Sequence, residues 1–161
     1  MESNGYTIKG VKSITGREGL GYECTLYHNG IKVALVVDVA DGGEANYYDV
    51  NDKEWDALKE YVKTLPPVTT KWGKEADQSF TCDVDIPIFV ENLVNDFEFL
   101  KQMKRKCKTK TVFRLDDTPD DEVISINMPY DATMKAHLEQ KYGKRLVEIV
   151  NETIAERIGA S

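Results

Sequence analysis

Four carboxylates surround a double glycine in the first third of the chain. Asp38, Asp41, Glu44 and Asp49 bracket Gly42-Gly43. Carboxylate oxygens at this density suit Ca²⁺ or Mg²⁺, and three of them could serve a metal-dependent hydrolase: Asp38, Asp41 and Glu44. The spacing matches no EF-hand loop, and an aspartate before glycine commonly stabilises a turn through its own backbone. We therefore expect no metal ion here. A metal-dependent hydrolase is the third functional hypothesis, after protein binding and nucleotide or nucleic-acid binding.

A basic segment contrasts with the acidic composition of the chain. Residues 101–114 contain no Asp or Glu and seven cationic side chains: Lys101, Lys104, Arg105, Lys106, Lys108, Lys110 and Arg114. Such a segment can bind a phosphate backbone or an acidic partner. The simpler interpretation is a helix C-terminus favoured by the helix dipole, followed by a strand edge protected by lysine.

Nucleotide or nucleic-acid binding by this basic segment is the second alternative. Only Phe113 lies among these cations as an aromatic ring for base stacking, which weakens that interpretation. The expected phosphate-binding residues are Lys101, Lys104, Arg105, Lys108 and Lys110.

Tyrosines and acids in and after residues 22–39 offer a contact surface for a protein. Tyr27 is expected on the strand face opposite the core, together with Ala34 and Val36, and tyrosine is enriched at interfaces. The expected partner-binding residues are Tyr27, Asp41, Glu44, Tyr47, Tyr48 and Asp49. The alternative is that a helix from the second half of the chain covers the Tyr27 face. We expect a non-enzymatic protein-binding module.

The histidines and cysteines form no recognised catalytic or cofactor motif. His28 lies beside a turn, where we expect it to be exposed, and neither His28 nor His137 has the neighbours of a zinc site. The three cysteines never form a Cys-x-x-Cys pair: Cys24, Cys82 and Cys107. A Cys–His nucleophilic pair is open but has no support from the sequence. We expect no catalytic residues and no cofactor.

A glycine-rich piece precedes the second expected strand. Gly16, Gly19 and Gly21 read G-x-x-G-x-G, and no helix N-terminus follows to face an anion. A turn therefore explains these glycines better than a phosphate loop.

Size and charge set the broad class. A chain of 161 residues with 41% hydrophobic residues favours a single domain, with 1–67 and 83–161 as possible sub-layers joined by a loop 68–82. The net charge of −7 argues against general duplex binding, although an acidic protein can occupy a basic surface meant for nucleic acid. The chain has neither a signal-peptide pattern nor an apolar run of membrane-spanning length, so we expect a cytoplasmic protein.

A β-hairpin is the clearest structural prediction. Asn29-Gly30 is the dipeptide that a type I′ turn prefers. Uniform pairing from this turn places six side chains on the core face: Tyr22 opposite Val37, Cys24 opposite Leu35, and Leu26 opposite Val33.

The remaining pattern predicts strands and helices in separate runs. Strands are expected at 6–13, 46–50, 110–115 and 123–128. Helices are expected after the N-caps Asn51 and Asp131, from Asp85 onward, and across 146–158. This order favours an α+β fold, an antiparallel β-meander with three or four packed helices. The 146–158 helix or an open hairpin edge could support a dimer.

One segment resembles a known group of proteins. Residues 16–48, GREGLGYECTLYHNGIKVALVVDVADGGEANYY, are similar to short uncharacterised proteins of phages and other mobile elements. Those proteins carry a strand, an N-G or D-G turn, a strand and a D-G-G step, and KYGKRLVEIVNE is a fainter echo. The resemblance implies a mobile-element origin and a role against a host system, such as inhibition of a host defence complex.

Overall fold

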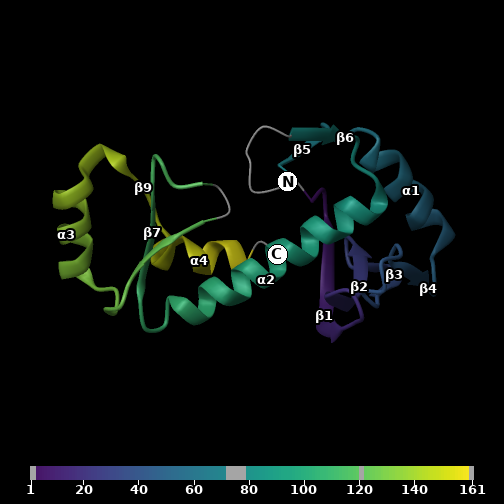
Figure 1. Ribbon diagram of the computed structural model, residues 1–161, viewed down its shortest axis with the longest axis horizontal. Coiled ribbons are helices and arrows are strands. Elements are labelled where there is room, and N and C mark those ends of the chain that lie inside the picture. The colour runs from purple at the N-terminus through teal and green to yellow at the C-terminus, as the bar shows by residue number, and fades with distance from the viewer. Residues whose placement is uncertain (1–2, 72–78, 120–121, 160–161) are drawn as a thin grey trace. The chain divides into compact units, whose positions relative to one another are not determined.

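The protein has an α+β fold that divides into two compact units (Figure 1). The computed structural model describes residues 3–71, 79–119 and 122–159. The units comprise residues 1–95 and 96–161, and the division falls inside helix α2 (Ile86–Lys106). Each unit is built around its own sheet and its own buried clusters.

The first unit contains the predicted antiparallel meander. Its four strands follow one another in space as they do in the chain: β1 (Tyr6–Thr15), β2 (Leu20–His28), β3 (Ile31–Asp38) and β4 (Asn46–Tyr48). Asn29 and Gly30 close the β2–β3 hairpin with φ angles of 49° and 84°. Positive φ at both central residues is the requirement of a type I′ turn, so the turn prediction is confirmed.

The register of this hairpin departs from uniform pairing after two residue pairs. Tyr27 pairs with Lys32, as the turn requires, but Leu26 pairs with Ala34. Val33 is therefore the extra residue of a β-bulge, and Val33 and Ala34 are both fully buried. A bulge lets two consecutive residues face the same core, which alternating polarity cannot reveal.

Beyond the bulge, the side chains of β3 lie on the opposite faces of the sheet from those predicted. Cys24 pairs with Val36 instead of Leu35, and Tyr22 pairs with Asp38 instead of Val37. Val36 is fully buried, so placing it opposite the core was wrong. Leu35 and Val37 lie on the face opposite Val36, because successive side chains alternate along a strand.

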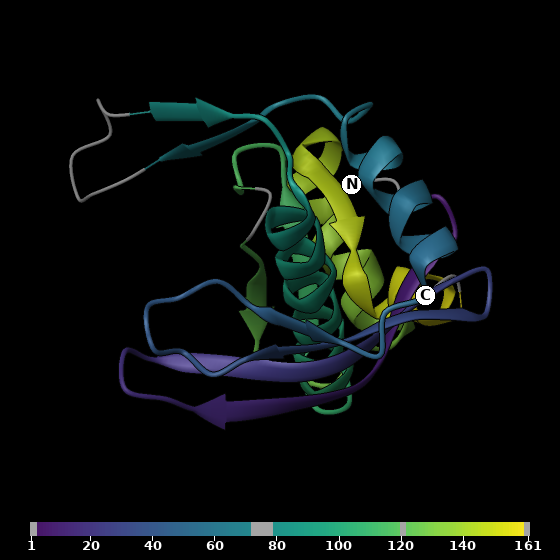
Figure 2. The same ribbon diagram turned by 90° about the vertical axis from the view of Figure 1, so that its right-hand side faces the viewer.

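Two helices cover one face of this sheet (Figure 2). Helix α1 (Asp52–Val62) begins at the predicted N-cap, where Asn51 Oδ1 accepts a hydrogen bond from the backbone N–H of Glu54. Asp85 Oδ1 accepts one from the Ile88 N–H at the start of α2. The core combines residues of β1–β3, α1, the first half of α2 and the segment before it: Tyr6, Cys24, Leu26, Val33, Val36, Leu58, Val62, Val84, Phe89, Val90 and Val94.

A second, smaller sheet of the first unit occupies the expected connecting loop. Strands β5 (Val68–Lys71) and β6 (Ser79–Cys82) pair antiparallel within the predicted loop 68–82. Facing threonines join them, because the hydroxyls of Thr69 and Thr81 lie 3.0 Å apart.

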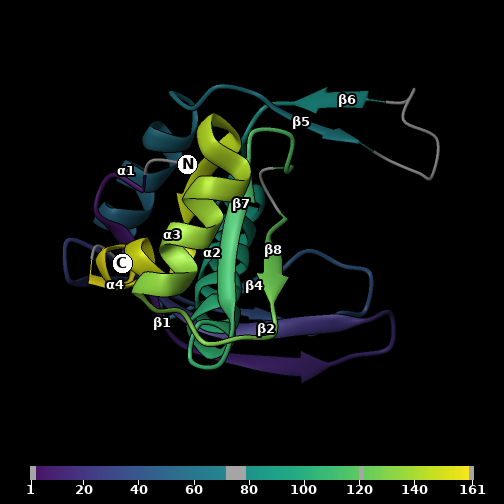
Figure 3. The ribbon, with the colours of Figure 1, turned by 90° about the vertical axis from the view of Figure 1, so that its left-hand side faces the viewer.

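The second unit has a three-stranded antiparallel sheet (Figure 3). Strand β7 (Thr111–Leu115) lies between β8 (Ile124–Ile126) and β9 (Leu146–Ile149). Helix α3 (Ala132–Tyr142) begins at the predicted N-cap Asp131. One cluster joins α3 to the sheet through Phe113, Leu115, Met134, Leu138 and Ile149, and another joins α2, β7 and helix α4 (Val150–Gly159) through Met103, Val112, Val150 and Ile154.

The prediction of one helix across 146–158 was wrong in its first turn. Residues 146–149 form β9 and pair with β7, and the helix begins only at Val150. The pattern was ambiguous because Leu146, Val150 and Ile154 have helical spacing, while a short, mostly apolar run such as 146–150 also fits a strand. Residues 146–149 form a strand because pairing with the available edge of β7 provides partners for the hydrogen-bonding groups of the β9 backbone.

Candidate functional site

One face of the four-stranded sheet is open. Within the described residues of the first unit, no helix lies on the face opposite the core (Figures 1 and 2). We call this the outer face and define its centre by Tyr27, Leu35, Val37 and Tyr48. Leu35 pairs with Tyr48 across β3 and β4, so the two side chains share this face. Tyr48 is 51% exposed, and Tyr27, Leu35 and Val37 are half-buried.

Charged side chains surround this apolar centre. The Lys9 ammonium lies 5.0 Å from the centroid of the Tyr27 ring. Two ion pairs lie on the same face: Lys12 with Glu23 at 2.7 Å, and Lys32 with Asp49 at 3.1 Å. Exposed pairs of this kind contribute little to stability. An apolar centre within a rim of mixed charge is the usual arrangement of a protein contact surface.

Tyr47 does not belong to the outer face. It pairs with Val36, and its ring packs 4.8 Å from the Trp55 ring. Burial raises the pKa of Tyr47 to about 12. Among the described residues, no group lies within hydrogen-bond distance of its buried hydroxyl. The expected contact residues Tyr47 and Tyr48 are therefore directed to opposite sides of the sheet.

The acidic loop after β3 is organised by its own backbone. Asp38 Oδ1 accepts a hydrogen bond from the Ala40 N–H at 2.8 Å, and Asp41 Oδ1 accepts one from the Gly43 N–H at 3.1 Å. Glu44 is exposed in the same loop. Within the described ranges, no group of three or more His, Cys, Asp or Glu side chains is placed to hold a metal ion. Two of the four carboxylates thus act as turn acceptors.

The predicted glycine turn is closely packed against this loop. A Cβ on Gly16 would lie 2.0 Å from the carbonyl oxygen of Val39, and one on Gly21 would lie 2.1 Å from that of Asp38. The glycines at these positions allow two backbones to approach each other. They therefore have a packing role that accounts for the glycine pattern.

His28 is held in a buried cluster, so the prediction that it is exposed was wrong. Its Nδ1 lies 2.7 Å from Glu54 Oε2, and the imidazole ring stacks on Tyr6 with centroids 4.2 Å apart. The Asn29 amide lies 3.1 Å from His28 Nε2. Sequence reasoning missed this cluster because Glu54 is 26 positions away from His28 in the chain.

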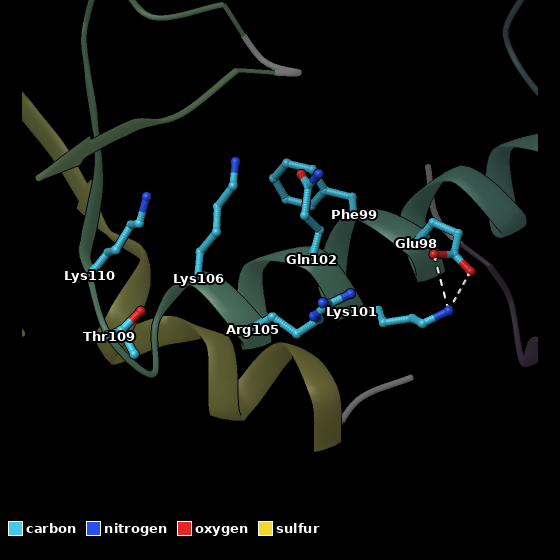
Figure 4. A pocket seen from close by; sticks show the side chains of 8 residues that line it. All are labelled: Glu98, Phe99, Lys101, Gln102, Arg105, Lys106, Thr109 and Lys110. Carbon is cyan, nitrogen blue, oxygen red and sulfur yellow. Dashed lines mark hydrogen bonds and ion pairs between the residues drawn. The ribbon is translucent and has the colours of Figure 1, made fainter. Parts of the chain in front are cut away.

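The basic segment forms one side of a groove in the second unit (Figure 4). This basic groove has a volume of about 720 Å³ and is lined by Glu98, Phe99, Lys101, Gln102, Arg105, Lys106, Thr109 and Lys110. Three of the five predicted phosphate-binding residues line it: Lys101, Arg105 and Lys110. Lys104 and Lys108 are not among the residues of the groove. Phe99 and Gln102 were missed because they lie outside or between the cations.

Asn151 fixes the turn that forms the far end of the groove. Its Nδ2 donates hydrogen bonds to the carbonyl oxygens of Cys107 at 3.2 Å and Lys110 at 2.9 Å. Its Oδ1 accepts one from the N–H of Val112 at 2.7 Å. One side chain on α4 thereby satisfies three backbone groups between α2 and β7, and it sets the position of Lys110.

The described helices and the comparisons with known proteins point to no additional site. In the part of the chain that the structure describes, every helix is too short or too polar to cross a membrane. Comparisons with protein-family models, curated proteins and solved structures found no match to this chain. Any function must therefore be argued from the outer face and the basic groove themselves.

Proposed function

We propose that this chain is a non-enzymatic protein-binding module that contacts its partner through the outer face. The observation that carries the proposal is the set of apolar and aromatic side chains opposite the core: exposed Tyr48 and half-buried Tyr27, Leu35 and Val37. Tyrosine and large aliphatic side chains combine apolar area with few rotatable bonds, so they lose little entropy on binding. When a partner covers the apolar centre of the outer face, apolar surface is removed from water, which favours binding.

Acidic side chains give the proposed contact surface a negative charge. Asp41, Glu44 and Asp49 lie in the segment that joins and follows β3 and β4. Together with a net charge of −7, they favour a partner with a basic surface, because complementary charge steers association. The contact set differs from the expected one in two ways: Leu35 and Val37 join it, and Tyr47 leaves it.

The resemblance of residues 16–48 to mobile-element proteins suggests the class of partner. Basic surfaces of host complexes commonly bind nucleic acid, and an acidic protein can occupy such a surface. We infer a cytoplasmic inhibitor that occupies the basic surface of a host defence complex. The acidic charge of the chain supports the proposal, because a carboxylate surface competes directly with phosphate.

Affinity capture from host lysate, read by mass spectrometry, tests the proposal. We expect a stoichiometric protein that the double variant Tyr27→Ala/Tyr48→Ala captures at least about tenfold less, as loss of two interface aromatics implies. The matched control removes two exposed apolar side chains of the second unit, Met128→Ala/Val147→Ala, and should capture the same protein undiminished. Equal capture by the Tyr27/Tyr48 variant would remove the outer face as the contact.

A second arm tests the charge. Glu44→Lys reverses one carboxylate of the exposed loop and should weaken capture more at low salt than at high salt, because salt screens surface charge. The control Glu60→Lys reverses an exposed carboxylate on α1 and should leave capture unchanged. An equal effect of the two reversals would mean that total charge matters and the loop does not.

A further inference from the structure

The basic groove is a second candidate site, separate from the outer face. Its side chains follow two rows on the C-terminal half of α2, since residues three and four apart share a helix face. Phe99, Gln102 and Lys106 form one row, which Lys110 continues from the turn after the helix (Figure 4). The order along this row is an aromatic ring, an amide and two cations.

The groove has a positive charge that its own carboxylate does not neutralise. Glu98 is the acidic residue of the lining, and it pairs with Lys101 at 2.8 Å. Arg105, Lys106 and Lys110 have no carboxylate within ion-pair distance in the described parts of the chain. Three cationic side chains remain at one groove of a protein whose net charge is −7. This local excess favours an anionic ligand.

The parts of the groove are held before a ligand arrives. Phe99 packs against the buried cluster that contains Met103, Val112 and Val150, which restricts the motion of its ring. Asn151 fixes the backbone at Lys110 through the hydrogen bond to its carbonyl oxygen. A site that is ordered in advance loses less entropy on binding, so each contact contributes more to affinity.

We infer that the basic groove binds a nucleotide unit. The base stacks on Phe99 and meets the Gln102 amide, and Lys106 and Lys110 of the same row hold its phosphate. Arg105, on the neighbouring row with Lys101, meets an adjacent phosphate. The groove is open to solvent and, at about 720 Å³, has room for one nucleotide unit. Aromatic stacking beside a cationic track is also how single strands are bound without sequence preference. A free nucleotide and one unit of a single strand present this same chemistry.

Fluorescence anisotropy with a labelled single-stranded thymidine dodecamer tests the inference. We expect binding that weakens about 20-fold from about 50 to about 200 mM salt, because three phosphate contacts give a log–log slope of roughly −2. The variant Arg105→Glu/Lys110→Glu should bind at least about tenfold more weakly and lower the slope toward roughly −0.7. The double reversal Lys104→Glu/Lys108→Glu makes the same change in net charge outside the groove and should leave the affinity within about threefold.

Two further arms separate the sources of the ligand and the role of the ring. A mononucleotide that displaces the dodecamer as well as shorter and longer strands do would identify a free nucleotide, whereas affinity that rises with strand length would identify nucleic acid. Phe99→Leu retains an apolar side chain but removes stacking, and should weaken either ligand about fivefold or more. Gln102→Glu places a carboxylate in the exposed row without disturbing the cluster and should also weaken binding.

Three results would overturn the inference. The first is the absence of binding by both probes at low salt. The second is an equal loss from the Lys104/Lys108 and Arg105/Lys110 reversals, which would reduce the effect to overall charge. The third is equal competition by a polyglutamate peptide with no effect of Phe99→Leu, which would assign the groove to an acidic protein segment.

Discussion

The imidazole Nδ1 of His28 lies 2.7 Å from the carboxylate Oε2 of Glu54, so the tip of the β2–β3 hairpin is joined to the first turn of α1. Both side chains are largely shielded from water, at 21% and 11% exposure. Tyr6 covers the imidazole from the β1 side. A hydrogen bond in such surroundings is expensive to break, because the remaining partner stays buried.

Removing the Glu54 carboxylate should destabilise the first unit. We expect Glu54→Ala to lower the free energy of unfolding by about 1–3 kcal/mol, because His28 is left without its partner. Glu54→Gln keeps a hydrogen-bonding oxygen and should cost less. The exposed Lys63–Glu60 pair provides the control, and Glu60→Ala should change stability by less than about 0.5 kcal/mol. Urea denaturation measures all three, and equal losses from Glu54→Ala and Glu60→Ala would contradict the prediction.

The bulge at Val33 predicts which of two adjacent valines tolerates a hydroxyl. Val36→Thr should lower the free energy of unfolding by about 1–3 kcal/mol, because it buries a hydroxyl in the core. Val37→Thr should change it by less than about 0.5 kcal/mol, because Val37 lies on the outer face. The two substitutions are nearly isosteric and keep strand propensity. Thermal unfolding in which Val37→Thr is the more damaging would support uniform pairing instead.

Asn151 should stabilise the second unit through its hydrogen bonds to the backbone. Asn151→Ala leaves the N–H of fully buried Val112 without its acceptor and should cost about 1–3 kcal/mol of unfolding free energy. Asn95→Ala removes an exposed amide on α2 and should be neutral within about 0.5 kcal/mol. Denaturation by urea compares the two variants, and a neutral Asn151→Ala would mean that the Val112 amide finds another acceptor.

Stability should decline in alkaline solution through Cys24. Burial raises the pKa of the Cys24 thiol from 9.0 to about 11. Because the folded-state pKa lies above the unfolded value, the protonated thiol stabilises the fold fully below pH about 9, and this contribution of roughly 2 kcal/mol is lost toward pH about 11. Cys24→Ala should make the decline over that range shallower, with the remaining loss above pH about 10 due to Tyr47, whose pKa is also raised. Urea midpoints from neutral to alkaline pH test this, and a Cys24→Ala profile parallel to that of the unchanged chain would refute it.

Local features of the fold could be predicted from the sequence. The Asn29-Gly30 turn and the N-caps Asn51 and Asp131 depend on residues within one turn of themselves, and all three were predicted correctly. The bulge at Val33 could not be predicted, because it is set by how two strands meet the helices above them. Strand β9 depends on the edge of β7, which is more than 30 positions away in the chain.

The candidate sites were likewise predicted only in part from the sequence. The basic segment was evident from composition, but which cations share a groove depends on helical phase, which excludes Lys104, and on the turn after α2, which excludes Lys108. A signal for Phe99 was present, because it lies three residues before Gln102 and seven before Lys106. Tyr47 and Tyr48 were predicted together, although neighbours in a strand face opposite ways.

Helix α2 supplies side chains to the cores of both units. Its first half supplies Phe89, Val90 and Val94 to one core, and its second half supplies Met103 to another. A helix of about ten residues is marginal in water without packing, so neither half would persist if its own unit melted. A fragment cut at Asn95 therefore keeps the half of α2 that its own core packs, and residues carried over from the other half would lose their helical structure.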